Sequence, residues 1–315
     1  MTVNNAGCNR DKVATGFFIK EGSLKMRVNK EAKIGIFIFL LPALVLFGTF
    51  FIFPIIYVFI RSFTEWNGIT PPVFNGLANY KALFTDPDFL RSLRNNLVWA
   101  VCAVTVQVTL ALIMAVILSK RPKGWKAFRA IYFLPQVISG VALAAMWRAV
   151  YNSSYGLLNG FLKLLGFDGA CRNWLGDSNT AFKAVLIYGL FYIGYYMTII
   201  MAGISSIPED YYEAAKIDGA TSIQADFYIT IPLVKSSVQT CVLLAAVFGL
   251  RTFENIYLLT NGGPGNKTSV IVLYLYNQMK TNHYGMANAA SVVLIMLGVL
   301  VIVTIRSIFA RIQRD

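Results

Sequence analysis

The segment SIPEDYYEAAKIDGATSIQADFYITIP, residues 206–232, decides how this chain is organised, because it is polar and charged yet lies between two long apolar segments. Its first part predicts a short helix. Ser206 and Glu209 have the spacing of a capping box, in which each side chain caps a backbone N–H at the start of the helix. Gly219 is expected to end that helix, because glycine adopts the left-handed conformation at little cost.

A second short helix is expected directly after this break. Thr221 or Ser222 can cap its first turn, and Pro232 limits how far it extends. The segment is therefore predicted to form a compact, capped and amphipathic helical hairpin. Between two membrane segments, such a hairpin indicates a surface that is presented to a partner.

The composition is that of an integral membrane protein. Of the 315 residues, 57% are hydrophobic and only 14% are charged, and the mean hydropathy is +0.59. Lys and Arg number 28 against 15 Asp and Glu, a net charge of +13. In a soluble protein this excess of positive charge would suggest a nucleic-acid partner. In a membrane protein it is typical of the loops that fix topology, so no nucleic-acid partner is expected.

Apolar runs of about 20 residues predict six transmembrane helices in an all-α fold. The run after Lys33 is too long for a cleaved signal peptide, so it is expected to remain as the first span. Arg251 and Glu254 interrupt the fifth run, and Pro135 and Gly140 lie inside the third. The predicted spans are 34–60, 97–118, 130–147, 184–204, 238–259 and 287–309.

The predicted domain organisation has a tail, a membrane body and a short C-terminus. These are residues 1–33, in which Met26 is an alternative start, then 34–309 with the helical hairpin at 205–236, then 310–315. Basic residues are concentrated in the tail, in the C-terminus and in the second loop. Since basic loops stay in the cytoplasm, both termini and the hairpin are expected there. The second loop carries Lys120, Arg121, Lys123, Lys126 and Arg129.

No catalytic or metal-binding cluster is visible in the sequence. His283 is the only histidine, and the four cysteines have no CxxC spacing. The segment Gly262-Gly-Pro-Gly-Asn-Lys-Thr268 is not a phosphate-binding loop, because Asn266 stands where that motif needs glycine. An enzyme is therefore not expected. The cysteines are Cys8, Cys102, Cys171 and Cys241.

Tyrosines share one face of the predicted fourth span. Tyr188, Tyr192 and Tyr195 have helical spacing, and Phe191 flanks them. Tyrosine can stack on a sugar and hydrogen-bond to it, but the same face can equally pack against another span. In the fifth span, Glu254 pairs with Arg251 or lines a polar pathway, because charges in a span usually face the bundle interior or water. Both alternatives remain open on these residues.

Glu213-Ala-Ala-Lys-Ile-Asp-Gly-Ala220, followed by Ile229-Thr-Ile-Pro232, resembles the EAA loop of ABC-importer permeases. The resemblance runs from about residue 30 to the C-terminus. It implies a six-helix permease subunit of an ATP-driven importer in a prokaryotic cell membrane, moving a sugar or oligosaccharide inward. Further matches to the carbohydrate-uptake branch are Phe133-Leu-Pro135, Tyr155-Gly-Leu-Leu-Asn159, Ala202-Gly-Ile-Ser-Ser-Ile-Pro208 and Ile256-Tyr-Leu-Leu-Thr-Asn-Gly-Gly-Pro264.

The same resemblance implies the partners. Such permeases pair with a second permease, dock on two cytoplasmic ATPase subunits and receive sugar from an external solute-binding protein. The chain lacks a nucleotide site, so no cofactor is expected and ATP belongs to the partner ATPase. The implied ATPase-coupling residues, which offer charges, close backbone approach and an apolar anchor, are Glu213, Ala214, Ala215, Asp218, Gly219, Ile223, Phe227 and Tyr228.

The resemblance also implies substrate contacts in the fourth and fifth spans. In the maltose permease of that branch, side chains of the corresponding spans hold the sugar. The hairpin departs from the family at Asp226, where an aromatic residue is usual. The alternative function is a ligand-sensing membrane scaffold that does not translocate. The predicted substrate-pathway residues are Tyr188, Phe191, Tyr192, Tyr195, Phe248, Gly249, Thr252 and Glu254.

Overall fold

A computed structural model describes residues 30–312. Most of the predicted tail, including Cys8 and Met26, and residues 313–315 of the predicted C-terminus lie outside this range. The chain divides into two units, one ending at Pro54 and the other beginning at Ile55, and each is described by itself.

The first predicted span is present as one long helical segment. It consists of α1 (Lys30–Phe47), a π-helical turn η1 (Gly48–Ile52) and α2 (Phe53–Arg61). The part from Gly35 to Arg61 has 27 residues and a mean hydropathy of 2.7. At about 1.5 Å per residue this length exceeds the thickness of a bilayer core.

The second span is longer than the sequence predicted. In the unit that begins at Ile55, α4 (Pro87–Cys102), η2 (Ala103–Gln107) and α5 (Val108–Ser119) run without a break. The predicted start at residue 97 is wrong by ten residues, because the polar first turns of α4 are also helical. Asp86 caps this start, since its side chain accepts a hydrogen bond of 2.8 Å from the Asp88 N–H.

The third predicted span is not continuous. The chain instead forms α6 (Trp125–Phe133), the 3₁₀ turn η3 (Leu134–Gln136) and α7 (Gly140–Val150), which are bent by 102° at a break. Pro135 in the turn has no N–H to donate, and Ser139 has extended backbone angles just before α7. Residues 130–147, the predicted third span, therefore lie in a bent pair of helices, which passes the length and hydropathy test for a span only when the two helices are taken together.

The fourth span, Ala181–Ser205, is divided into α9 (Ala181–Leu190) and α10 (Gly194–Ser205) by a short turn. Gly194 starts α10 directly against the backbone of α6. A Cβ added at Gly194 would lie 2.1 Å from the carbonyl oxygen of Tyr132. A larger residue would force the two helices apart.

The hairpin consists of α11 (Asp210–Ile217), α12 (Ser222–Ala225), the π-helical turn η5 (Asp226–Thr230) and α13 (Ile231–Leu233). The predicted capping box at Ser206 is wrong, because Glu209 is the N-cap residue and makes no side-chain cap. The Ser206 hydroxyl donates instead to the Gly203 carbonyl. The predicted cap of the second helix is confirmed: Thr221 forms a complete capping box with Gln224.

The fifth predicted span is also broken. After a bend of 65° from α13, α14 (Lys235–Leu250) ends before the charged residues, and α15 (Glu254–Leu259) begins a separate helix. Residues 251–253 between them are not helical. Asn96 of α4 stabilises this break, because its amide donates to the carbonyls of Gly249 (3.3 Å) and Leu250 (3.0 Å).

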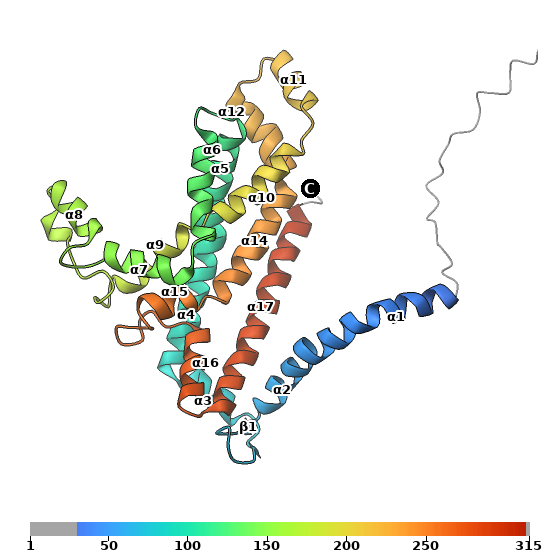
Figure 1. The fold of residues 1–315 in the computed structure, drawn as a ribbon, viewed down its shortest axis with the longest axis vertical. Coiled ribbons are helices and arrows are strands. Elements are labelled where there is room, and N and C mark those ends of the chain that lie inside the picture. Colours follow the sequence, from blue (N-terminus) through green and yellow to red (C-terminus); the bar gives the residue numbers. More distant parts are fainter. Residues whose placement is uncertain (1–29, 313–315) are drawn as a thin grey trace, which may run out of the picture. The chain divides into compact units, whose positions relative to one another are not determined.

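The sixth span is the 29-residue helix α17 (Tyr284–Ile312). Within the unit that begins at Ile55, the hairpin lies at one end of the helices, and α17 runs from the opposite end toward it (Figure 1). Within residues 30–312, four helices are long and apolar enough to cross a membrane, and the number is six if each bent pair is one span. The remaining elements are β1 (Thr64–Glu65), β2 (Val73–Phe74), α3 (Ala78–Thr85), α8 (Leu157–Leu164), η4 (Asp168–Ala170) and α16 (Ile271–Lys280).

Polar residues of α4 attach the loop before α16 to the helices. The Asn95 amide donates to the carbonyls of Lys267 (2.9 Å) and Ser269 (2.8 Å), and the Tyr274 hydroxyl donates to Asp86 (2.6 Å). Burial raises the pKa of Tyr274, and the hydrogen bond to Asp86 raises it further. The start of α4, the loop before α16 and α16 itself therefore pack together at the end of the helices opposite the hairpin (Figure 1).

Candidate functional site

A cavity of about 510 Å³ lies among the membrane helices. This volume is within the range of about 300–1,000 Å³ usual for small-ligand sites. Its walls come from the middle of the second span, the turn η3, the break between α9 and α10, and the break between α14 and α15. They carry aromatic and amide side chains, among them Trp99, Gln107, Gln136, Tyr192, Tyr195, Phe248, Thr252, Glu254 and Asn255.

Most of the predicted substrate-pathway residues meet at this cavity. Tyr192 and Tyr195 reach it from the fourth span, and the Tyr195 ring lies 6.2 Å from that of Phe248, measured between centroids. Thr252 and Glu254 reach it from the broken end of the fifth span. The breaks in both spans therefore lie where the predicted residues come together.

Two predicted residues do not line the cavity. The Tyr188 ring is fully buried, and its hydroxyl is 2.6 Å from that of Tyr192. Phe191 is 55% exposed and packs against Trp147, with ring centroids 5.0 Å apart. The predicted continuous tyrosine face does not form, because the turn after Leu190 divides the helix. Tyr188 supports Tyr192 from behind the cavity wall.

Gln107 is a lining residue that the sequence prediction missed. Its amide donates to the carbonyls of Gly189 (3.0 Å) and Tyr192 (3.1 Å) at the break between α9 and α10, where the Gly189 carbonyl also accepts from the Tyr192 N–H (3.2 Å). A glutamine in the middle of an apolar span was the available signal, because an intramembrane polar group needs a partner or a function. Gln107 therefore holds the break open beside the cavity.

Gly249 lines the cavity but also sets the distance between α14 and α4. A Cβ at Gly249 would lie 2.9 Å from the Cα of Ala100. The small residue lets the backbones approach closely, as at other helix crossings in membranes. Substitution at Gly249 would alter packing as well as the cavity wall.

Glu254 does not pair with Arg251. Among residues 30–312 no ion pair joins them, and Arg251 is exposed and absent from the cavity lining. The Glu254 carboxylate lies instead over Gly140 at the start of α7. A helix N-terminus carries about half a positive charge, so it stabilises a carboxylate there. The predicted pairing is wrong, and the polar-pathway alternative fits the structure.

The hairpin at the other end presents a stiff and partly apolar surface. Gly219 has φ +78°, and the N–H groups of Gly219 and Ala220 bond back to the carbonyls of Lys216 and Ala215. These two bonds form a Schellman motif, which ends α11 as the sequence predicted. Glu213, Ala214 and Asp218 are exposed on the same segment, and Ala215 is half-buried.

Large apolar side chains of the hairpin are exposed in the part of the chain that the structure describes. Ile223 is 66% exposed, Phe227 64% and Tyr228 81%, as expected for an anchor that enters a partner. Ile217, which the sequence prediction missed, is 86% exposed at the end of α11. Ile217 is the only large aliphatic residue of α11, and that was the signal for it.

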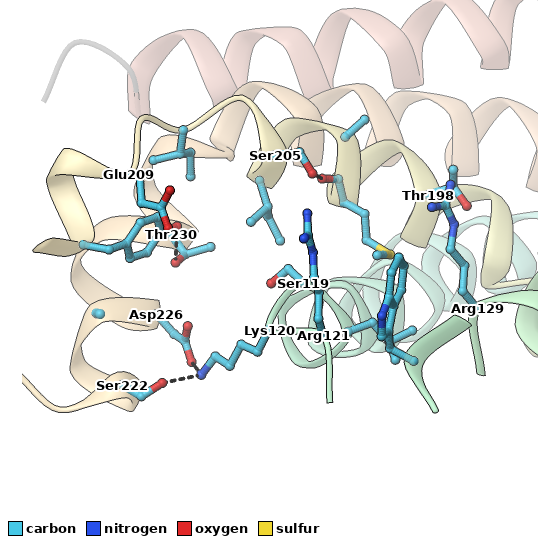
Figure 2. A pocket seen from close by; sticks show the side chains of 18 residues that line it. Ser119, Lys120, Arg121, Arg129, Thr198, Ser205, Glu209, Ser222, Asp226 and Thr230 are labelled. Atoms are coloured by element: carbon cyan, nitrogen blue, oxygen red, sulfur yellow. Dashed lines mark hydrogen bonds and ion pairs between the residues drawn. The ribbon is translucent and has the colours of Figure 1, made fainter. Parts of the chain in front are cut away.

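Asp226 has a partner within the chain. Its carboxylate forms an ion pair with Lys120 directly after α5, and the Lys120 ammonium also donates to the Ser222 hydroxyl at 2.8 Å (Figure 2). These contacts join the second helix of the hairpin to the end of the second span. The residue that departs from the family pattern therefore attaches the hairpin to the membrane body.

Comparisons with known proteins agree with this arrangement. Residues 107–314 match the family described as binding-protein-dependent transport system inner membrane component. A probable ABC transporter permease of Pyrococcus horikoshii is 38% identical over 85% of this chain and 93% of its own length. A trehalose/maltose transport system permease of Thermococcus litoralis is 35% identical over 85% and 90%. A diacetylchitobiose uptake system permease of Streptomyces coelicolor is 35% identical over 81% and 76%.

Solved structures show the same fold. A bacterial ABC transporter involved in the import of the acidic polysaccharide alginate contains a chain with a TM-score of 0.78, at 22% identity over 90% of this chain and 97% of that chain. The alginate transporter in complex with an alginate pentasaccharide-bound periplasmic protein has a TM-score of 0.79 at 23% identity. The predicted all-α membrane permease fold is thereby confirmed.

Proposed function

The chain belongs to the family of binding-protein-dependent transport system inner membrane components, and we propose that it moves an uncharged sugar or oligosaccharide through the cavity beside Tyr192. The observation that carries this substrate class is the cavity lining. It combines aromatic rings with amide and hydroxyl groups, which suit stacking and hydrogen bonding with a sugar. Relatives named for trehalose/maltose and for diacetylchitobiose support it.

The proposed partners are two ATPase subunits, a second permease and an external solute-binding protein. The exposed apolar anchor of Ile223, Phe227 and Tyr228 supports docking of the hairpin on an ATPase. ATP hydrolysis is assigned to that partner, and the chain itself is not an enzyme and holds no cofactor.

The proposed orientation places the hairpin and both termini in the cytoplasm. In the unit that begins at Ile55, the helix α17 runs toward the end that carries the hairpin, which supports a shared side for the hairpin and the C-terminus (Figure 1). The basic loop at Lys120 and Arg121 lies at that end as well, as expected for a cytoplasmic loop. Residues 34–309 form the proposed six-span body, with 1–33 and 310–315 in the cytoplasm.

The test is transport by the assembled complex in liposomes. The complex is loaded with ATP on the ATPase side, and labelled maltose, trehalose and diacetylchitobiose are supplied with the solute-binding protein. We expect uptake that requires both ATP and the binding protein. Uptake without ATP would indicate a secondary transporter. Ligand-stimulated ATP hydrolysis without uptake would indicate the ligand-sensing scaffold, which the comparisons do not favour.

The docking role has its own test. Glu213→Lys reverses an exposed charge on α11 and is expected to abolish uptake while the protein still inserts in the membrane. Lys163→Glu, a reversal on α8 away from the hairpin, is the control and is expected to leave uptake intact. Normal uptake by the Glu213 variant would remove this residue from the docking surface.

A further inference from the structure

A second and larger cavity, of about 740 Å³, lies between the hairpin and the membrane helices α5, α6 and α10. Its two sides differ in charge. Lys120, Arg121 and Arg129 come from the end of α5, the following loop and α6, whereas Glu209 and Asp226 come from the hairpin segment. Figure 2 shows Arg121 and Arg129 extending from the α5–α6 side toward the wall that carries Thr198 and Ser205.

The two acidic groups do not neutralise this basic side. Asp226 is already paired with Lys120. In the part of the chain that the structure describes, no ion pair or side-chain hydrogen bond is recorded for Arg121, Arg129 or Glu209. Two guanidinium groups against one carboxylate leave an excess of positive charge in the cavity. The basic side is therefore open to an anion.

Two hydroxyl groups that line the cavity already donate hydrogen bonds within their own helix. Thr198 and Ser205 donate to carbonyls of their own helix, Gly194 at 2.9 Å and Met201 at 2.9 Å. Arg121 and Arg129 thus offer the cavity two charged guanidinium donors, whose planar fork fits phosphate oxygens. Arg121 also has φ +50°, a left-handed conformation that favours glycine, and such backbone strain is concentrated at binding and active sites.

We propose that this cavity binds a phosphate group, and that its source is the head group of an anionic phospholipid. Basic pockets between transmembrane helices at the membrane surface bind such head groups. Trp125 lines the cavity at the start of α6, and tryptophan at the end of a span is typical of the membrane interface. The acyl chains would follow the exposed apolar side chains of α6, Phe128 and Ile131.

The test measures lipid binding by native mass spectrometry on the full-length protein in detergent. Phosphatidylglycerol and cardiolipin are compared with phosphatidylcholine. We expect the anionic lipids to be retained preferentially, and Arg121→Gln/Arg129→Gln to weaken their binding about 25-fold, or about fivefold for each arginine. The matched control, Lys123→Gln/Lys126→Gln, removes two charges from the same loop and helix outside the cavity lining and should retain the lipid.

Each outcome decides the proposal. Equal retention of anionic and zwitterionic lipids by the natural protein, or equal loss in both double variants, overturns it. Unchanged lipid binding in the arginine variant also overturns it. If that variant separately fails to copurify with the ATPase subunits, the surface is a protein contact. Inorganic phosphate or glycerol 3-phosphate is added in a separate titration. Displacement of the lipid at submillimolar concentration keeps the phosphate site but assigns it to a soluble anion.

Discussion

The Glu254 carboxylate lies over Gly140 so closely that a Cβ at residue 140 would be 2.5 Å from its Oε1 atom. This contact joins the break in the third span to the break in the fifth. α7 starts at Gly140 and α15 at Glu254, and the two helices pack against each other. The carboxylate at the start of α7 thus has favourable electrostatics inside the membrane body and still faces the cavity.

Gly140→Ala is the first test of this relationship. The added methyl group would displace the Glu254 carboxylate from the start of α7, and because the contacting atoms are the end of a flexible side chain, the protein should fold normally. We expect uptake to fall while the complex still assembles. Gly160→Ala on α8 is the control, because a Cβ there meets nothing within 4 Å. Normal uptake by the Gly140 variant would show that the carboxylate position does not matter for transport.

The second prediction concerns the ion pair between Lys120 and Asp226. Lys120→Asp and Asp226→Lys each place two like charges together, so each is expected to detach the second helix of the hairpin from the end of α5. We expect uptake per ATP hydrolysed to fall in both single variants and to recover in the double exchange. The readout is the ratio of sugar transported to phosphate released, which a general loss of protein would not change.

If both single variants are impaired and the double exchange does not restore the ratio of sugar transported to phosphate released, then Lys120 and Asp226 act separately. The pair is partly exposed, with Lys120 42% and Asp226 16% accessible, so its contribution to stability is expected to be small. The effect should therefore appear in coupling and not in the amount of assembled complex.

The third prediction concerns the break in the hairpin. Gly219 has φ +78°, and a Cβ added there would meet no atom within 4 Å. A substitution at this position therefore strains the backbone but causes no clash. Gly219→Val is expected to cost at least 1 kcal/mol and to impair docking of the ATPase. Gly219→Asn should be much milder, because asparagine tolerates the left-handed conformation. Copurification of the ATPase subunits measures both variants. Equal behaviour of the two would contradict the role of this turn.

The sequence correctly predicted features that depend on neighbouring residues or on overall composition. The turn at Gly219 and the cap of the second short helix are determined by residues within a few positions. Gly219 ends α11 as predicted, and Thr221, one of the two predicted candidates, is the cap. Four of the six apolar runs correspond to long apolar helices of the structure, and the other two overlap bent pairs of helices. The capping box at Ser206 was wrong because the chain forms a turn at Ser206–Ile207 and the helix starts later.

The breaks inside the spans depend on partners far away in the chain. Gln107 supplies the donors for the break after α9, and Asn96 supplies those for the break after α14. Periodicity within one span cannot reveal such donors. For the same reason the tyrosine spacing at 188, 192 and 195 suggested one continuous face, whereas the structure separates Tyr188 from the cavity. The contact between Glu254 and Gly140 was equally invisible in the sequence.

The last prediction separates two neighbouring aromatic residues that the sequence could not distinguish. Tyr192 lines the cavity, whereas Phe191 packs against Trp147 outside it. Tyr192→Ala removes a stacking surface and a hydroxyl, so we expect the KM for sugar uptake to rise about tenfold, as for loss of about 1–2 kcal/mol of contact. Phe191→Ala is the matched control and should leave the KM within twofold. A larger effect at Phe191 than at Tyr192 would mean that the sugar follows a path outside this cavity.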